Sequence, residues 1–255
     1  MNMSRKSCKL FYKLCAILNI VLFVIVLTPT CSLGGQFKVD RDGFTIDLPP
    51  GWIQIPQAII SEREQQVAVL APKTKIPHYD YGFQFGTRDQ WFSYPYILIK
   101  IKRTGRITTA EFKKLEKFSY DQTAQKLQKS FGDLIKEAEI GKMRYDPVSQ
   151  VVWLNTGINI SAIGRISGIT ALIPTEYGFI QMNGYTREQE FMGFVSVFHD
   201  LVRNVTLDEN VKYQAKPTDS IPLLNTIKWD AVLVAVLTGI ILAVIGGFWR
   251  KRQTP

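Results

Sequence analysis

The segment FTIDLPPGW, residues 44–52, lies near the start of the folded domain and combines a strand with a sharp turn. Apolar and polar side chains alternate from Phe44 to Leu48, which is the pattern of a strand with one buried face. The PPG sequence then turns the chain, and WIQI, residues 52–55, follows as a second short strand. The segment therefore predicts that the domain opens with short strands joined by a tight turn.

Two helices are predicted farther along the chain from capping boxes, in which two side chains satisfy backbone donors at a helix start. Thr108 and Glu111 form the first box and predict a helix that runs to about Ser130. Thr186 and Gln189 form the second box, and the helix after it carries apolar residues at i, i+3 and i+4 spacing. These apolar residues are Phe191, Phe194, Val195, Phe198, Leu201 and Val202.

Short strands account for most of the remaining domain, because apolar and polar side chains alternate over several short segments. The predicted strands are 66–70, 96–101, 134–144, 150–155, and a hairpin of 168–173 with 179–183. The order is several strands, a helix, a run of strands and a final helix. This order suits one antiparallel sheet with helices packed on it, so the predicted class is α+β over residues 35–207.

The charge of the chain is concentrated at its two ends. The formal net charge is +9, from 31 basic and 22 acidic residues. Seven of the basic residues flank the two apolar segments, which leaves 24 basic and 22 acidic residues between 35 and 230. The positive charge therefore indicates membrane topology, and a nucleic acid is not an expected partner. All three cysteines precede residue 35, which excludes a disulfide, a thiolate metal site and a cysteine nucleophile from the domain.

The stretch AVLVAVLTGIILAVIGGFW, Ala231 to Trp249, contains 19 residues and no charge. A helix of this length spans about 28 Å, close to the hydrocarbon thickness of a bilayer. It predicts a transmembrane helix at 230–249, followed by a basic cytoplasmic tail at 250–255. The alternative is a helix buried in a protein core. The expected anchors at the membrane interface are Trp229, Trp249, Arg250, Lys251 and Arg252.

A second apolar run, residues 14–27, follows a basic start and precedes small or polar residues. Residues 1–34 therefore form either a secretory signal peptide or a first transmembrane segment. Both alternatives place the domain on the extracytoplasmic side of the cell membrane and the C-terminus in the cytoplasm. The polar stretch of 208–229 contains two prolines and is expected to be a tether between domain and membrane.

The domain resembles a known family at this level of detail. A strand followed by Pro-Gly-Trp at 44–52, a long middle helix, antiparallel strands and an aromatic closing helix are similar to the PsbP-like fold. The resemblance covers about residues 36–207. This fold is shared by an extrinsic subunit of photosystem II, a Ran-binding nuclear import factor and many exported bacterial proteins. The resemblance implies a binding or assembly role instead of an enzymatic one.

The most unusual stretch is YDYGFQFGTRDQWFSYPY, residues 79–96, in which eight of 18 residues are aromatic. Rings that alternate along a strand share one face, and that face belongs either to the core or to a partner surface. A loop that dips into the membrane is a third interpretation. The candidate partner surface is Tyr79, Tyr81, Trp91, Phe92 and Tyr94.

Basic residues are concentrated between 100 and 129, a stretch that contains nine lysines and arginines and three acidic residues. They form either a solvated helix face or a contact for anionic headgroups or an acidic partner. The candidate basic face is Lys113, Lys114 and Lys117.

No catalytic, metal or cofactor site is predicted. His78 and His199 are far apart in the sequence, and neither belongs to a set of three or four metal ligands. His199 is expected at the surface or boundary of the last helix. Nucleophile-elbow, phosphate-loop and zinc-protease motifs are absent from the sequence.

The sequence therefore favours a membrane-tethered extracytoplasmic binding or assembly module that is not an enzyme. Its expected partners are the lipid bilayer, through Ala231–Trp249, and a protein of unknown identity. Two alternatives stay open. One is an enzyme with a carboxylate-based or tyrosine-based site, and the other is an envelope protein whose domain contacts lipid.

Overall fold

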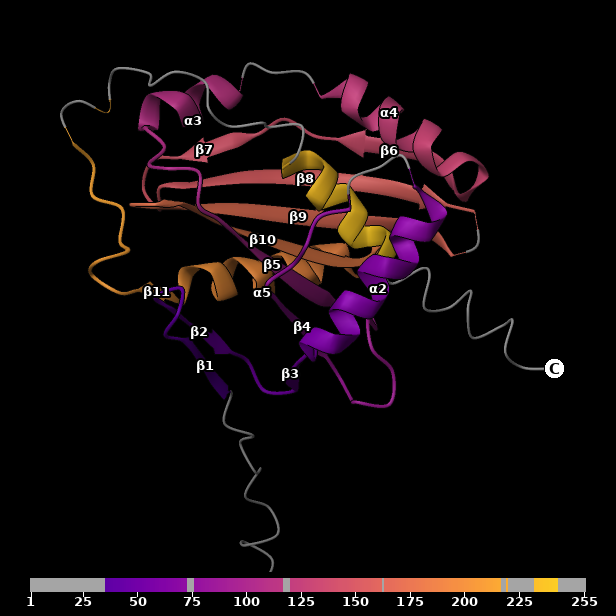
Figure 1. Cartoon of the computed structure of the whole chain (residues 1–255), viewed down its shortest axis with the longest axis horizontal. Coiled ribbons are helices and arrows are strands. Elements are labelled where there is room, and N and C mark those ends of the chain that lie inside the picture. Colours follow the sequence, from indigo (N-terminus) through magenta and orange to yellow (C-terminus); the bar gives the residue numbers. More distant parts are fainter. Residues whose placement is uncertain are drawn as a thin grey trace, which may run out of the picture. The chain divides into compact units, whose positions relative to one another are not determined.

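The computed structural model describes residues 35–72, 76–116, 120–161, 163–216, 219 and 232–242. Its main feature is an eight-stranded antiparallel sheet with strand order β3-β4-β5-β10-β9-β8-β6, in which β7 also pairs with β8 (Figure 1). The strands are β3 (Trp52–Gln54), β4 (Tyr81–Phe85), β5 (Tyr96–Lys102), β6 (Ile135–Ile140), β7 (Arg144–Asp146), β8 (Val151–Ile160), β9 (Gly164–Thr175) and β10 (Gly178–Arg187).

A smaller antiparallel sheet has the order β1-β2-β11. It consists of β1 (Gly35–Val39), β2 (Phe44–Leu48) and β11 (Val205–Leu207). The strand expected at 44–48 is β2, and it pairs with β1 and β11 on its two sides. The structure is thus an α+β fold with antiparallel sheets, as the sequence predicts.

The long strands β9 and β10 lie inside the large sheet, and both of their faces are covered. Every side chain of β9 from Ile166 to Thr175 is buried. The predicted hairpin is confirmed, with Thr175 paired to Gly178 at its turn. Gly178 has a φ of +148°, and a Cβ there would lie 1.9 Å from the carbonyl oxygen of Lys102, so only glycine fits.

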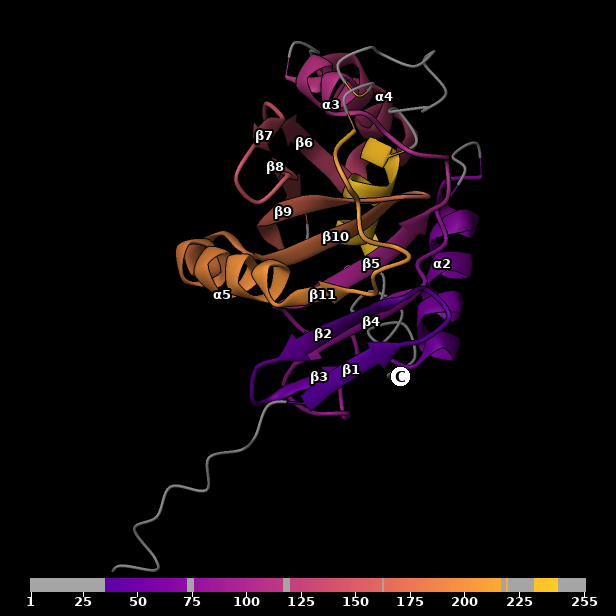
Figure 2. The ribbon, with the colours of Figure 1, turned by 90° about the vertical axis from the view of Figure 1, so that its left-hand side faces the viewer.

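Helices cover the two faces of the large sheet (Figure 2). Helix α5 (Phe191–Arg203) and the small sheet pack on one face, where Phe194, Phe198 and Ile46 join the core. The opposite face carries α2 (Gln57–Leu70), α3 (Thr109–Leu115), α4 (Asp121–Phe131) and a helix of residues 232–242. The large sheet therefore separates two apolar layers.

Two sequence predictions about elements are wrong in detail. The strand expected at 66–70 belongs to helix α2, whose buried residues Ile60 and Val67 lie seven positions apart on one helical face. The long helix expected at 108–130 is divided into α3 and α4. Between them Tyr120 is buried and its hydroxyl contacts the sulfur of Met143, which fixes the break against the core.

The two capping boxes have opposite outcomes. The box of Thr108 and Glu111 is confirmed, with both reciprocal hydrogen bonds present at the start of α3. The box of Thr186 and Gln189 is wrong, because Thr186 still belongs to strand β10. Its hydroxyl donates to the Glu190 carboxylate at 3.2 Å, and α5 begins at Phe191 after a 3-10 turn (η2, Glu188–Glu190).

The described residues contain no helix with both the length and the apolar character needed to cross a bilayer. Residues 232–242, part of the predicted span, are helical, and all of their side chains except that of Val234 are buried. The segment of 1–34, Trp229, Trp249 and the tail of 250–255 lie outside the described residues.

Candidate functional site

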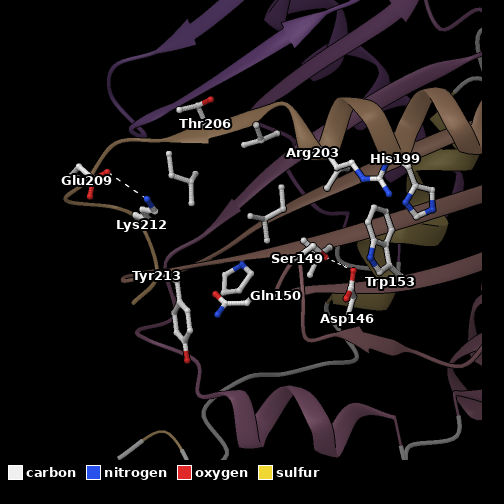
Figure 3. A pocket seen from close by; sticks show the side chains of 16 residues that line it. Asp146, Ser149, Gln150, Trp153, His199, Arg203, Thr206, Glu209, Lys212 and Tyr213 are labelled. Atoms are coloured by element: carbon white, nitrogen blue, oxygen red, sulfur yellow. Dashed lines mark hydrogen bonds and ion pairs between the residues drawn. The ribbon is translucent and has the colours of Figure 1, made fainter. Parts of the chain in front are cut away.

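A pocket with a volume of about 570 Å³ opens beside α5, β8 and the chain that follows β11 (Figure 3). Strand β8 and the preceding turn supply one wall, helix α5 a second, and residues 205–213 a third. The pocket is lined by Asp146, Ser149, Gln150, Val151, Trp153, Ile173, Pro174, His199, Val202, Arg203, Val205, Thr206, Leu207, Glu209, Lys212 and Tyr213. Its size falls within the range of small-molecule sites.

Trp153 and His199 form one end of the pocket. Their ring centroids are 4.0 Å apart and the rings are tilted by 33°. Both side chains are half-buried. Burial lowers the pKa of His199 below its usual value, and the nearby Arg203 lowers it further. The imidazole is therefore neutral at neutral pH, and the pair presents a flat, mostly apolar wall.

Charged groups of both signs surround this wall. The Asp146 carboxylate accepts hydrogen bonds from the Ser149 hydroxyl, at 2.6 Å, and from the Val148 amide, at 2.9 Å. These bonds lower the pKa of Asp146, so the carboxylate stays ionised. On the opposite rim Lys212 pairs with Glu209 at 3.5 Å. Together with Arg203, these groups give the pocket donors and acceptors around an apolar floor.

The geometry of the pocket suits non-covalent binding. The Ser149 hydroxyl donates to Asp146, and His199 lies against the indole of Trp153. An activated serine instead requires its hydroxyl to donate to the imidazole. Within the part of the chain that the structure describes, no three histidine, cysteine, aspartate or glutamate side chains converge as metal ligands do.

The aromatic residues that the sequence singles out lie mainly against the core. Tyr79 and Phe92 are buried there, and Trp91 and Tyr94 are half-buried against the same cluster. Tyr81 is half-buried in the other core and donates a hydrogen bond of 2.6 Å to Asp42. The alternating rings are therefore divided between the two faces of the large sheet. Tyr79 precedes β4, which begins only at Tyr81.

The predicted basic face is partly described. Lys113 and Lys114 are exposed on α3, at the end of the helix whose dipole favours positive charge. Lys117 lies outside the described residues.

Sequence reasoning did not identify the pocket of Figure 3. Its wall combines Asp146 and Trp153 with His199, some 46 positions beyond Trp153 in the sequence. Only the pairing of β8 with β9 and the return of α5 across the sheet bring them together. No short motif connects these residues, so the sequence contains no local signal for the site.

Comparisons with known proteins give a distant structural similarity. No family model and no curated protein matches the sequence. The solution structure of a cyanobacterial PsbP (CyanoP) from Synechocystis is 14% identical, with a TM-score of 0.39 over 69% of this chain and 93% of that one. LpqN, involved in cell envelope biogenesis of Mycobacterium tuberculosis, is 14% identical, with a TM-score of 0.35 over 68% of this chain and 91% of that one. The resemblance to the PsbP-like fold is thus found among solved structures, and a similarity this distant says nothing about function.

Proposed function

We propose that the chain is a membrane-tethered binding module. The domain works on the extracytoplasmic side, and the pocket beside Trp153 and His199 receives a segment of a protein partner. The observation that supports binding is the lining of this pocket, where an aromatic wall is combined with charges of both signs. An extended peptide segment offers the matching chemistry, because it carries apolar side chains, amide groups and charged groups.

The membrane tether is supported by the sequence. Ala231–Trp249 is uncharged and long enough to span a bilayer, and a basic tail follows it. The basic residues before the first apolar run indicate the same orientation. Protease added to intact spheroplasts, from which the outer envelope has been removed, should then digest the domain and leave a small C-terminal fragment with the membrane. Complete protection of the domain would contradict the proposed orientation.

The pocket is tested by photocrosslinking in the membranes of the native host. A photoreactive amino acid at Gln150, which lines the pocket, is compared with one at Val148, which is 93% exposed and lies two positions away. We expect a discrete adduct from position 150 only. The exposed Arg203 provides the matched variant, because Arg203→Glu reverses one rim charge without disturbing the core.

If the Arg203 side chain contributes about 1 kcal/mol or more to partner binding, Arg203→Glu should reduce the adduct formed at position 150 by about fivefold or more. Identical adducts from both positions, or an adduct that Arg203→Glu leaves unchanged, would exclude the pocket as the partner site. Thermal unfolding of each variant shows that the domain is folded in every sample.

A further inference from the structure

The helix of residues 232–242 occupies a groove on the face of the large sheet opposite α5 (Figure 2). Leu237, Ile240 and Ile241 join the core beside α2, and Val232 and Val236 join the core near α3. A helix that is apolar on all sides must be buried either in a protein core or in a membrane. Here the domain itself covers a segment that is also suited to a bilayer.

Three tyrosine hydroxyls bind the backbone of this helix. Tyr185, on β10, donates to the carbonyl oxygen of Val236 at 2.7 Å. Tyr96, on β5, donates to the carbonyl oxygen of Gly239 at 2.6 Å. Tyr79 donates to the carbonyl oxygen of Ala235. A carbonyl oxygen has two lone pairs, so it can accept a tyrosine bond in addition to one from a backbone amide.

The groove also requires a small residue at one position of its occupant. A Cβ on Gly239 would lie 2.1 Å from the Tyr185 hydroxyl oxygen and 2.5 Å from the ring carbon that bears it. The Tyr185 ring cannot move aside easily, because the Tyr96 ring lies 5.1 Å from it and both tyrosines are fully buried on paired strands. The groove therefore fits this helix through its backbone and through Gly239, and not through apolar character alone.

The fit between the helix and the groove is incomplete, because two buried polar groups in the described part of the chain lack partners. The Gln181 amide nitrogen reaches the Val232 carbonyl oxygen at 3.3 Å. Among the described residues, however, the Gln181 amide oxygen and the Thr238 hydroxyl are buried without a hydrogen-bond partner. Each such group opposes burial. In the empty groove, water would satisfy Gln181 and the three tyrosine hydroxyls, so the groove suits both an occupied and an open state.

We propose that this tyrosine groove, formed by Tyr79, Tyr96, Tyr185 and Gln181, is a docking site for residues 232–242 that competes with the bilayer for the same segment. The helix lies in the groove when no membrane is available, and its insertion into a bilayer opens the groove. This inference rests on the proposed membrane tether. The occupant is the chain's own helix, which the carbonyl contacts and Gly239 identify.

Docking is tested on the full chain without lipid, by acetylation of tyrosine hydroxyls with N-acetylimidazole and mass spectrometry. Tyr185 should react slowly in the wild type. Gly239→Leu places a side chain against Tyr185 and should accelerate the reaction by about tenfold or more. Val234→Leu enlarges the one half-buried residue of the helix and should leave Tyr185 protected. Equal protection of Tyr185 in the wild type and in Gly239→Leu would overturn the docking site.

A second variant removes one hydroxyl and keeps the ring. Tyr185→Phe should speed hydrogen exchange of the amides of 232–242 by about threefold to tenfold, since a net hydrogen bond is lost. This variant keeps the shape of the groove, so the test does not depend on whether Gly239→Leu folds. Unchanged exchange in Tyr185→Phe would contradict the role of the hydroxyl.

Exchange with the membrane is tested in vesicles of phosphatidylethanolamine and phosphatidylglycerol. The wild type, Gly239→Leu and Val234→Leu should all float with the vesicles after alkaline carbonate, because each keeps an apolar segment. Tyr185 should then react rapidly in all three. If the protein floats but Tyr185 stays protected, the proposed transfer of the helix from the groove to the bilayer is wrong, while the tether is still supported. A wild type that does not float would refute the tether and the exchange together, and the lipid-free result would still decide on the docking site.

Discussion

At the scale of single residues, Gln84 fixes the loop that carries Trp91 and Phe92. Its side chain is fully buried on β4. The amide nitrogen donates to the carbonyl oxygens of Thr87 and Gln90, at 2.9 and 2.8 Å, and the amide oxygen accepts from the Phe92 amide at 2.7 Å. Phe92 has a φ of +60°, which is unfavourable for a bulky residue. The three hydrogen bonds compensate for this conformation.

Gln84→Ala should therefore destabilise the domain by about 2–3 kcal/mol, because it leaves the buried Phe92 amide without a partner and removes two further hydrogen bonds. The measurement is the free energy of unfolding from urea denaturation, followed by tryptophan fluorescence. The matched control is Gln36→Ala, which removes one exposed hydrogen bond to Asp47 and should cost less than about 0.5 kcal/mol. Similar losses in the two variants would show that Gln84 does not support the loop.

The sequence predicts local residue pairs better than pairs that the fold brings together. Thr108 and Glu111 are three positions apart, so their capping box is readable from the sequence and is present. The loop contacts of Gln84 are also close in the sequence, but no known motif links a buried glutamine to such a turn. Trp153 and His199 are in contact only through the fold, and the sequence gives no indication of this pair.

At the scale of elements, α5 packs so closely on β10 that one position must be glycine. A Cβ on Gly184 would lie 2.6 Å from a ring carbon of Phe198 and 2.8 Å from the Phe194 ring. Gly184→Ala should therefore cost about 1–3 kcal/mol, since neither ring can leave the core without opening a gap. Gly193, in α5 itself, has open space around its Cβ position.

Gly193→Ala is the control for this prediction, and it should stabilise the domain by up to about 1 kcal/mol through helix propensity. Urea denaturation of the two variants gives both free energies. Changes of the same sign would mean that packing of α5 on β10 does not determine the effect of Gly184→Ala.

The error at 66–70 also belongs to this scale. The letters QVAVL alternate as a strand does, and this window contains no stronger helical signal. The burial of Ile60 and Val67 favours a helix over a strand, because helical spacing places both residues on the face that meets the core. The helical spacing is therefore visible only over the whole of Gln57–Leu70, which contains both residues.

At the scale of the whole molecule, the position of the apolar C-terminal segment could be predicted only in part. Its composition requires that it be removed from water, and both a bilayer and a protein groove satisfy this requirement. The apolar segment itself carries no charge that distinguishes the two. What distinguishes them is the row of tyrosines under the helix, and these come from three separate parts of the chain.

Arg106 holds the chain between the domain and this segment against the domain. Its side chain is only 15% exposed and pairs with Glu176 and with Asp219, the latter at 2.6 Å. It also lies 4.4 Å from the centroid of the Tyr213 ring. The expected tether of 208–229 is therefore bound to the domain at Asp219.

Arg106→Ala should release this attachment, because it leaves the Asp219 carboxylate poorly paired at a partly buried position. We expect a loss of about 1–3 kcal/mol, between the values for exposed and buried ion pairs. The measurement is hydrogen exchange at the Gln214 and Lys216 amides, which donate to Glu176 and Asp219 and should exchange about tenfold faster. Lys38→Ala breaks an exposed pair with Asp40 and is the control that should leave both amides unchanged.

The pH dependence of this attachment follows from Asp219. Burial disfavours its charge, but hydrogen bonds from Arg106, the Lys216 amide and Tyr213 outweigh burial and lower its pKa to about 2. A carboxyl whose pKa is lower in the folded state stabilises the fold above its ordinary pKa and loses this contribution as the pH falls through the lowered value. After correction for intrinsic exchange, protection of the Lys216 amide should thus persist at pH 4 and decline only toward pH 2 in the wild type. A decline already complete at pH 4 would show that Arg106 does not hold Asp219 ionised.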